Sequence, residues 1–167
     1  MTTPAVQSNV ELKGSFEPLV KGFSDKTERG ILRATLRRTA QQVVLKAARA
    51  NLRSAGGGRF AKSLTVKTTV TNKVANAKIG AKRGSPLAKV GHLIERGTKS
   101  HAMTPRRSKV MVGRKDGIFY GTFVEHPGTQ AKPWLNPALE DRKVPTVARF
   151  GELIVEEINK AVAKGKR

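Results

Sequence analysis

The sequence predicts a single α+β domain with a long N-terminal helix, an antiparallel sheet of about four strands, and a C-terminal helix packed on that sheet. Apolar residues recur at helical spacing near both ends of the chain. Between those segments, short runs alternate between apolar and polar residues, as half-buried strands do. The length of 167 residues fits one domain. We therefore expect an arm over residues 1–24 and one domain over residues 25–167.

The first predicted helix spans residues 26–52. Asp25 and Glu28 have the spacing of a capping box, which marks a helix start. The predicted buried face consists of residues three or four positions apart: Leu32, Leu36, Ala40, Val43 and Ala47. The glycines within residues 54–59 end the helix. Residues 1–24 mix Pro, Gly and Ser without a period, so we expect them to order only against a partner.

Two hairpins are predicted in the middle of the chain. The first pairs residues 64–70 with residues 75–81. The second pairs residues 109–112 with residues 118–125 around Asp116-Gly117, a dipeptide that favours tight turns. Between the hairpins, residues 97–108 are rich in turn formers and basic residues, which predicts an exposed loop with a contact role.

The last predicted helix begins at Asn136 and Pro137, which form an N-cap and first-turn pair. Pro145 either kinks this helix or restarts it. Apolar residues at helical spacing predict its buried face: Val147, Phe150, Ile154, Ile158 and Ala161. Three glutamates, Glu152, Glu156 and Glu157, fall outside that face.

The chain is strongly basic, with 33 Lys and Arg against 12 Asp and Glu and a net charge of +21. Residues 29–115 contain 22 Lys or Arg and a single acid, Glu95. Such one-sided charge creates a positive field whose natural counterpart is a polyanion. Nucleic acid is the first candidate, an acidic protein surface is the second, and a basic face that serves solubility alone is the third interpretation.

Two groups of cations are the candidate contact residues. Arg38, Lys46, Arg49 and Arg53 share one face of the first helix, and Arg106, Arg107 and Lys109 lie in or beside the predicted loop. The sequence shows no recognition helix, zinc finger or aromatic-rich basic strand. We therefore expect any nucleic-acid contact to go to phosphates and to be indifferent to base sequence.

The sequence predicts no enzyme, no metal site and no cofactor. It has no Cys, and His92, His101 and His126 lack partners at metal-ligand spacing. It also lacks a nucleophile elbow, and its acids are too scattered for a magnesium site. The sequence has no run of 18 apolar residues, so we expect no membrane partner. It also shows no leader in which a basic segment precedes an apolar one, so we expect assembly in a cytoplasm.

The most distinctive segment runs from Gly91 to Glu140. It contains GHLIERGTKSH and, after a predicted strand, VEHPGTQAKPWLNPALE. This pattern resembles the tail-completion, or neck, proteins of long-tailed bacteriophages, the lambdoid minor tail protein type. The matching positions are Glu95, Gly97 and Thr98, then Ala131, Pro133, Trp134, Leu135, Pro137 and Ala138. Arg96 replaces a commoner aromatic residue and Trp134 replaces the usual Phe, and the resemblance covers about residues 26–163.

The resemblance implies a structural virion protein that completes the tail and joins it, at the neck, to the head-side connector. The implied partners are further copies in a hexameric ring, the tail terminator or tail tube protein, the head-closure protein, and genome DNA in the channel. A ring is the natural product of head-to-tail contacts that close. The basic surface would then face DNA or acidic faces of neighbouring rings.

Two other functional classes remain open. A sequence-independent nucleic-acid-binding protein acting outside the particle would bind duplex tightly, and salt would weaken that binding steeply. A nuclease would require magnesium-dependent cleavage that is abolished when one acid is removed.

Overall fold

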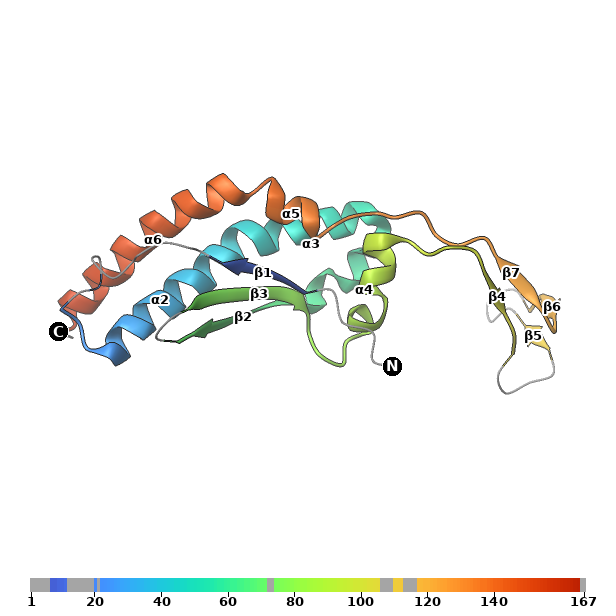
Figure 1. The fold of residues 1–167 in the computed structure, drawn as a ribbon, viewed down its shortest axis with the longest axis horizontal. Coiled ribbons are helices and arrows are strands. Elements are labelled where there is room, and N and C mark those ends of the chain that lie inside the picture. The colour runs from blue at the N-terminus through green and yellow to red at the C-terminus, as the bar shows by residue number, and fades with distance from the viewer. Residues whose placement is uncertain are drawn as a thin grey trace.

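In a computed structural model, the chain forms an elongated body from which a long β-hairpin projects at one end (Figure 1). The structure describes residues 7–11 (backbone only), 20, 22–71, 74–105, 110–112 and 117–165. The body contains two long helical segments and a small sheet, whereas the projecting hairpin consists of short strands far from the body's core. The chain is therefore mixed helix and strand, as the sequence predicts.

The predicted first helix is confirmed as one helical path. It comprises α2 (Asp25–Thr39), a wider π-helical turn (Ala40–Leu45) and α3 (Lys46–Leu52). Ser24, with extended backbone angles, is the N-cap, so α2 begins at Asp25. A further turn (Arg53–Gly57) contains Gly56 at φ 85°, which ends the regular helix because other residues avoid that conformation.

The sheet of the body has three antiparallel strands in the order β1-β3-β2, which corrects the expected four-stranded sheet. A 3₁₀ segment (Gly58–Ser63) leads into β2 (Leu64–Val70), which pairs with β3 (Ala75–Ala81) as predicted, and the register places Leu64 opposite Ala81. The edge strand β1 (Gln7–Glu11) pairs with β3. This piece of the expected N-terminal arm therefore belongs to the sheet of its own chain.

The C-terminal helix α6 (Lys143–Ala163) packs on α2 and not directly across the sheet, which corrects a second expectation. Phe150 and Ile154 of α6 share a buried cluster with Ile31 and Leu36 of α2. The order of layers is thus α6, then the α2–α3 path, then the sheet (Figure 1). Pro145 lies in the first turn of α6, where its missing N–H breaks no helical hydrogen bond.

Two short helices complete the body around a second buried cluster. The apolar patch at residues 90–94 belongs to α4 (Pro86–Arg96), capped by Ser85, whose Oγ accepts from the Ala88 N–H at 3.4 Å. Helix α5 (Asn136–Glu140) precedes α6. The cluster around Leu52, Ile79 and Trp134 joins α3, the sheet, α4 and α5. No helix in the described part of the chain is long and apolar enough to cross a bilayer.

The projecting hairpin is defined here as residues 98–129. Its two limbs pair through β4 (His101–Met103) and β7 (Val124–His126), with His101 opposite His126. Farther out, β5 (Met111–Val112) pairs with β6 (Phe119–Gly121). The second predicted hairpin therefore exists, but its strands are separate from the sheet of the body. Most of its expected turn, residues 113–116, lies outside the described residues.

Candidate interaction surfaces

The helix cations expected to face a partner do not form one surface. Arg38 is half-buried, and its Nη1 donates to Glu157 Oε1 at 2.7 Å and lies 3.2 Å from Glu156 Oε1. These glutamates, Glu156 first, raise the pKa of the Arg38 guanidinium. Arg49 Nη2 donates to the Leu64 carbonyl oxygen at 3.1 Å, which ties α3 to the start of β2. Both side chains thus have bonding partners within the chain.

The remaining predicted cations divide into two groups. Lys46 and Arg53 are exposed on the helical path. Arg106, Arg107 and Lys109 lie outside the described residues, so their contacts stay a prediction.

The solvent side of the sheet presents a pair of cations that the sequence analysis did not single out. Lys67 of β2 and Lys78 of β3 are exposed and directly opposite each other in the antiparallel register. Opposed side chains in such a pair have Cβ atoms about 5 Å apart, and like charges there destabilise the sheet. The alternation of the strands already placed both lysines on the polar side. Predicting their opposition required the register of the hairpin as well.

Acidic and basic residues are distributed unevenly between the segments of the body. Residues 58–94, which form β2, β3 and most of α4, contain eight Lys or Arg and no acid. Residues 136–165, which form α5 and α6, contain five acids and five Lys or Arg. The segment that forms β2 and β3 is therefore strongly basic, whereas the segment that forms α5 and α6 is balanced.

A buried carboxylate holds the root of the projecting hairpin, where both limbs join the body. Glu95, in the last turn of α4, is 5% exposed. Its Oε2 accepts from the backbone N–H groups of Trp134 at 2.8 Å and Leu135 at 2.9 Å, and its Oε1 accepts from Asn136 at 3.0 Å. One side chain thereby satisfies three donors at the start of α5, where a negative charge is also favoured by the helix dipole.

The two limbs approach closely just beyond Glu95. Thr98 and Thr129 exchange backbone hydrogen bonds of 2.8 and 3.0 Å. A glycine precedes each of them, and both glycines have positive φ: 70° at Gly97 and 90° at Gly128. A Cβ at Gly97 would collide with the carbonyl oxygen of Thr129, and a Cβ at Gly128 with that of Thr98. Glycine is therefore required on both limbs.

The aromatic residue of the motif fastens the returning limb to the body. Trp134 is 1% exposed, and its Nε1 donates to the carbonyl oxygen of Gly91 at 3.3 Å. Its own carbonyl oxygen accepts from Asn51 Nδ2 at 3.2 Å, which adds a link to α3. Pro133 and Pro137 bracket this anchor. The structure thus gathers Glu95, Gly97, Thr98, Pro133, Trp134 and Pro137 at the root.

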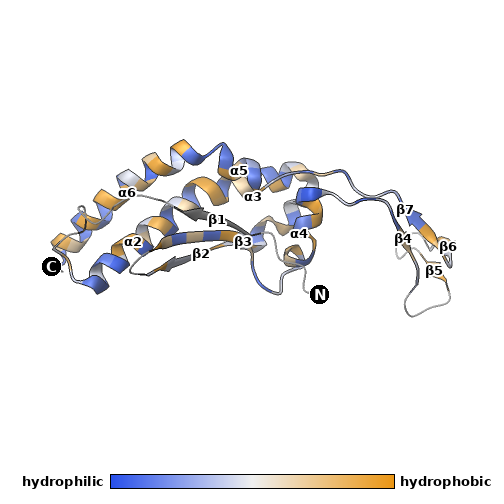
Figure 2. Ribbon diagram, viewed as in Figure 1, coloured by the Kyte–Doolittle hydropathy of each residue, from blue (hydrophilic) through white to orange (hydrophobic). Residues whose placement is uncertain are grey.

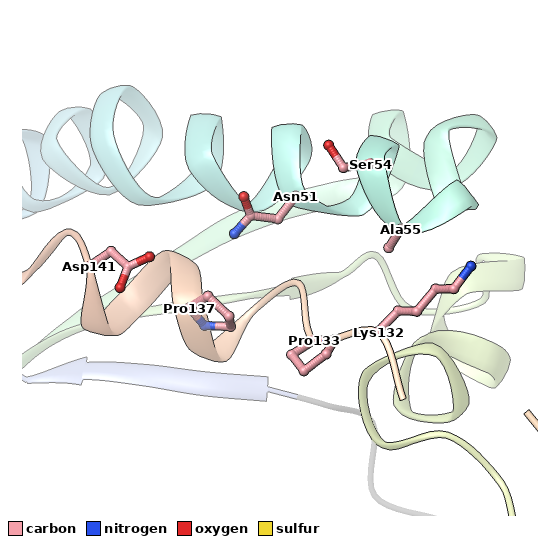
Figure 3. Close-up of a pocket in the computed structure, with 7 residues that line it drawn as sticks. All are labelled: Asn51, Ser54, Ala55, Lys132, Pro133, Pro137 and Asp141. Atoms are coloured by element: carbon pink, nitrogen blue, oxygen red, sulfur yellow. The ribbon is translucent and has the colours of Figure 1, made fainter. Parts of the chain in front are cut away.

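A shallow groove lies beside this root, between the helical path and the returning limb (Figure 3). Its volume is about 390 Å³, and Asn51, Ser54, Lys132 and Asp141 are its polar lining residues. Ser54 Oγ donates to the Ala50 carbonyl oxygen at 3.3 Å. The groove contains no His, and among the described residues no group of three or more acids and histidines is placed to hold a metal ion.

The far end of the projecting hairpin exposes apolar side chains. The limbs near the body are hydrophilic, and hydrophobic residues gather toward the outer strands (Figure 2). Phe119 is 75% exposed and Phe123 60% exposed. Val112, Ile118 and Tyr120 are also exposed, and we call these five residues the hairpin tip. Exposed apolar patches of this kind mark surfaces that bind a partner.

Comparisons with known proteins returned no matching family model, no similar curated protein and no similar solved structure.

Proposed function

We propose that this chain is a structural virion protein of a long-tailed bacteriophage, which completes the tail and joins it at the neck to the head-side connector. The observation that carries the proposal is the projecting hairpin. A long extension with an apolar end, held to the body by a buried carboxylate, suits a subunit that interlocks with neighbours. The positions that resemble the tail-completion family meet at its root, and this gives those residues a common structural purpose.

In this proposal the partners are other copies of the chain in a hexameric ring, the tail terminator or tube protein, the head-closure protein and the genome DNA. Strands β2 and β3, which contain no acid, support a surface turned toward DNA phosphates or acidic ring faces. Arg38 and Arg49 bond within the chain, so we place the contact on the sheet side around Lys67 and Lys78 instead.

Deleting the gene from the phage or prophage that encodes it tests the proposal. Electron microscopy of the lysate should show DNA-filled heads beside separate tails of normal length. Restoring the chain in trans should restore joined particles, whereas restoring a version with residues 99–128 replaced by a short turn should not. Intact, infectious virions from the deletion would overturn the proposal.

The opposed lysines also favour a second candidate function, sequence-independent binding of nucleic acid outside the particle. This function predicts tight binding of free duplex, with a loss of roughly 10³ to 10⁵ in affinity between 50 and 200 mM salt if some six to ten phosphates are engaged. A neck protein should instead bind free duplex weakly and purify together with tails.

A further inference from the structure

Two histidines lie against each other near the base of the projecting hairpin. His101 of β4 and His126 of β7 are directly opposite in the antiparallel pair. Their ring centroids are 5.1 Å apart, and the ring planes differ by 27°, so the rings are stacked. His101 is exposed and His126 is half-buried. Neither the root contacts nor the proposed function uses this pair.

The hydrogen bonds of the two rings give each ring a different role. The Nδ1 atom of His101 lies 3.0 Å from the carbonyl oxygen of Lys99. Because a carbonyl oxygen can only accept, this nitrogen donates and carries a proton. The backbone N–H of Gly128 donates to Nδ1 of His126 at 3.0 Å. A nitrogen that accepts has no proton, so this bond exists only while His126 is neutral.

The hydrogen bond from Gly128 secures the returning limb of the hairpin. Gly128 has φ 90°, and a Cβ there would collide with the carbonyl oxygen of Thr98. The next residue, Thr129, exchanges backbone hydrogen bonds with Thr98. The bond between Gly128 and His126 spans two residues, as in the turns that Asn and Asp side chains form. It therefore holds the chain where β7 meets the paired backbone of the root.

A proton on His126 breaks this arrangement in two ways. The proton occupies Nδ1, so Gly128 loses its acceptor and two donors face each other. Protonation of His101 as well places like charges on the two stacked rings, which repel each other. Imidazole is the side chain whose charge ordinarily changes between about pH 5 and 8, so mild acid supplies these protons.

The charged groups around the pair do not oppose these effects. Strands β4 and β7 pack mainly on each other. On the face of the two rings, strand alternation places Met103 and Val124 on one side and Lys99, which is exposed and adds positive charge, on the other. Glu125 is the only acid among the described residues of the hairpin, and the same alternation turns it to the opposite face.

We propose that the stacked pair is a pH-sensitive clasp for the projecting hairpin. At neutral pH, His126 is uncharged, accepts from Gly128 and stacks on His101. In mild acid, the protonated ring releases Gly128 and is repelled by His101, so the limbs separate at their base. The open base binds protons that the closed base excludes, so the closed form gains stability as pH rises and loses it as pH falls. The clasp goes beyond the proposed function and does not rest on it.

Hydrogen exchange of the full-length chain at about pH 7.5 and about pH 5 tests the clasp. The protection of the Gly128 and Thr129 amides is taken relative to the exchange rate of an unfolded chain at the same pH. In the parent, this protection should fall at least about tenfold in acid. The amide of Leu52 in α3 should keep its protection, because both pH values lie above the ordinary range of carboxyl groups.

His126→Asn is the decisive variant. The Asn side-chain oxygen accepts from the N–H two residues later at either pH, so this variant should fold and its protection should change less than about twofold. His101→Asn removes the repulsion but leaves the acceptor, so its response should be smaller than that of the parent. His92→Asn is the matched control, because His92 is half-buried on α4 outside the pair, and it should respond as the parent does.

The remaining outcomes overturn the clasp. Equal protection of Gly128 and Thr129 at the two pH values in the parent would show that the base does not open in acid. An equal loss in His126→Asn would assign the response to another group. A parent-sized response in His101→Asn would exclude repulsion within the stacked pair, and an equal loss at Leu52 would show that acid acts on the whole fold.

Discussion

The carboxylate of Glu95 accepts a hydrogen bond from the backbone N–H of Trp134 at 2.8 Å, which joins two positions 39 residues apart, one before and one after the projecting hairpin. Because the same carboxylate also accepts from Leu135 and Asn136, the end of α4 and the start of α5 form one unit. The hairpin therefore leaves the body from a fixed base.

Glu95→Gln should destabilise the fold by about 2 kcal/mol. The amide keeps one acceptor oxygen but turns an NH2 group toward a backbone N–H, and it loses the charge that strengthens all three bonds. Urea unfolding measures the change. Glu125→Gln, on the exposed side of β7, is the control and should stay within about 0.5 kcal/mol of the parent. Equal effects of the two substitutions would contradict the role given to Glu95.

Gly97→Ala should cost about 3 kcal/mol or more. Gly97 has φ 70° and ψ −174°, a region that is almost exclusive to glycine, and a Cβ would strike the backbone of Thr129. Gly121→Ala is the matched control, because Gly121 also has positive φ but open space around it, so about 1 kcal/mol is expected. Hydrogen exchange at the Thr98 and Thr129 amides would locate the damage. Unchanged protection there would argue against the close approach.

Lys67→Thr should stabilise the fold slightly and weaken binding to DNA. Removing one of two opposed like charges relieves repulsion in the sheet, which is worth several tenths of a kcal/mol to about 1 kcal/mol. If the sheet side contacts phosphates, the salt slope of duplex binding should fall by about one.

Lys143→Thr removes the same charge from α6 and serves as the control for binding, which should not change. A gain in stability without any loss of binding would leave the repulsion argument standing and remove the sheet side as the phosphate surface.

Acid should weaken the link between α2 and α6. Lys160 first, and then Arg38, hold the pKa of Glu156 below its ordinary value of about 4.5. A carboxyl group with a lowered folded pKa stabilises the fold above its unfolded pKa, and that stability is lost as pH falls through the folded pKa. The melting temperature of the parent should thus fall more than that of Glu156→Gln as pH drops from about 5 to about 3. Parallel pH profiles would exclude this contribution.

The long first helix and the two strands of the β2–β3 hairpin were predictable, because both depend on local periodicity. The short strand β1 was not, because five residues without strong alternation became a strand only by pairing with the edge of β3. Local patterning also misplaced Val147, which is 60% exposed although its spacing resembles that of the buried face of α6. Apolar residues of α6 therefore extend beyond the face of that helix that packs against the rest of the body.

At the candidate surfaces, the sequence identified the residues of the root but not their purpose. The partners of Glu95 lie about 40 positions away, and no local pattern states that the limbs converge there. The contacts of the cations were harder to predict, because the position of a residue on a helical face does not show which element packs beside it. Arg38 looked available on the helix, and its two glutamates come from a helix more than a hundred residues later.

The paired backbone of Thr98 and Thr129 brings the entry and exit of residues 99–128 side by side. The hydrogen bonds at the root already close the loop formed by the thirty residues 99–128. We therefore expect the body to keep its fold when the length or sequence of that segment changes. We expect this segment to be exchangeable for another of different sequence without loss of the fold of the body. Partner choice can consequently evolve, or be engineered, independently of the fold that carries it.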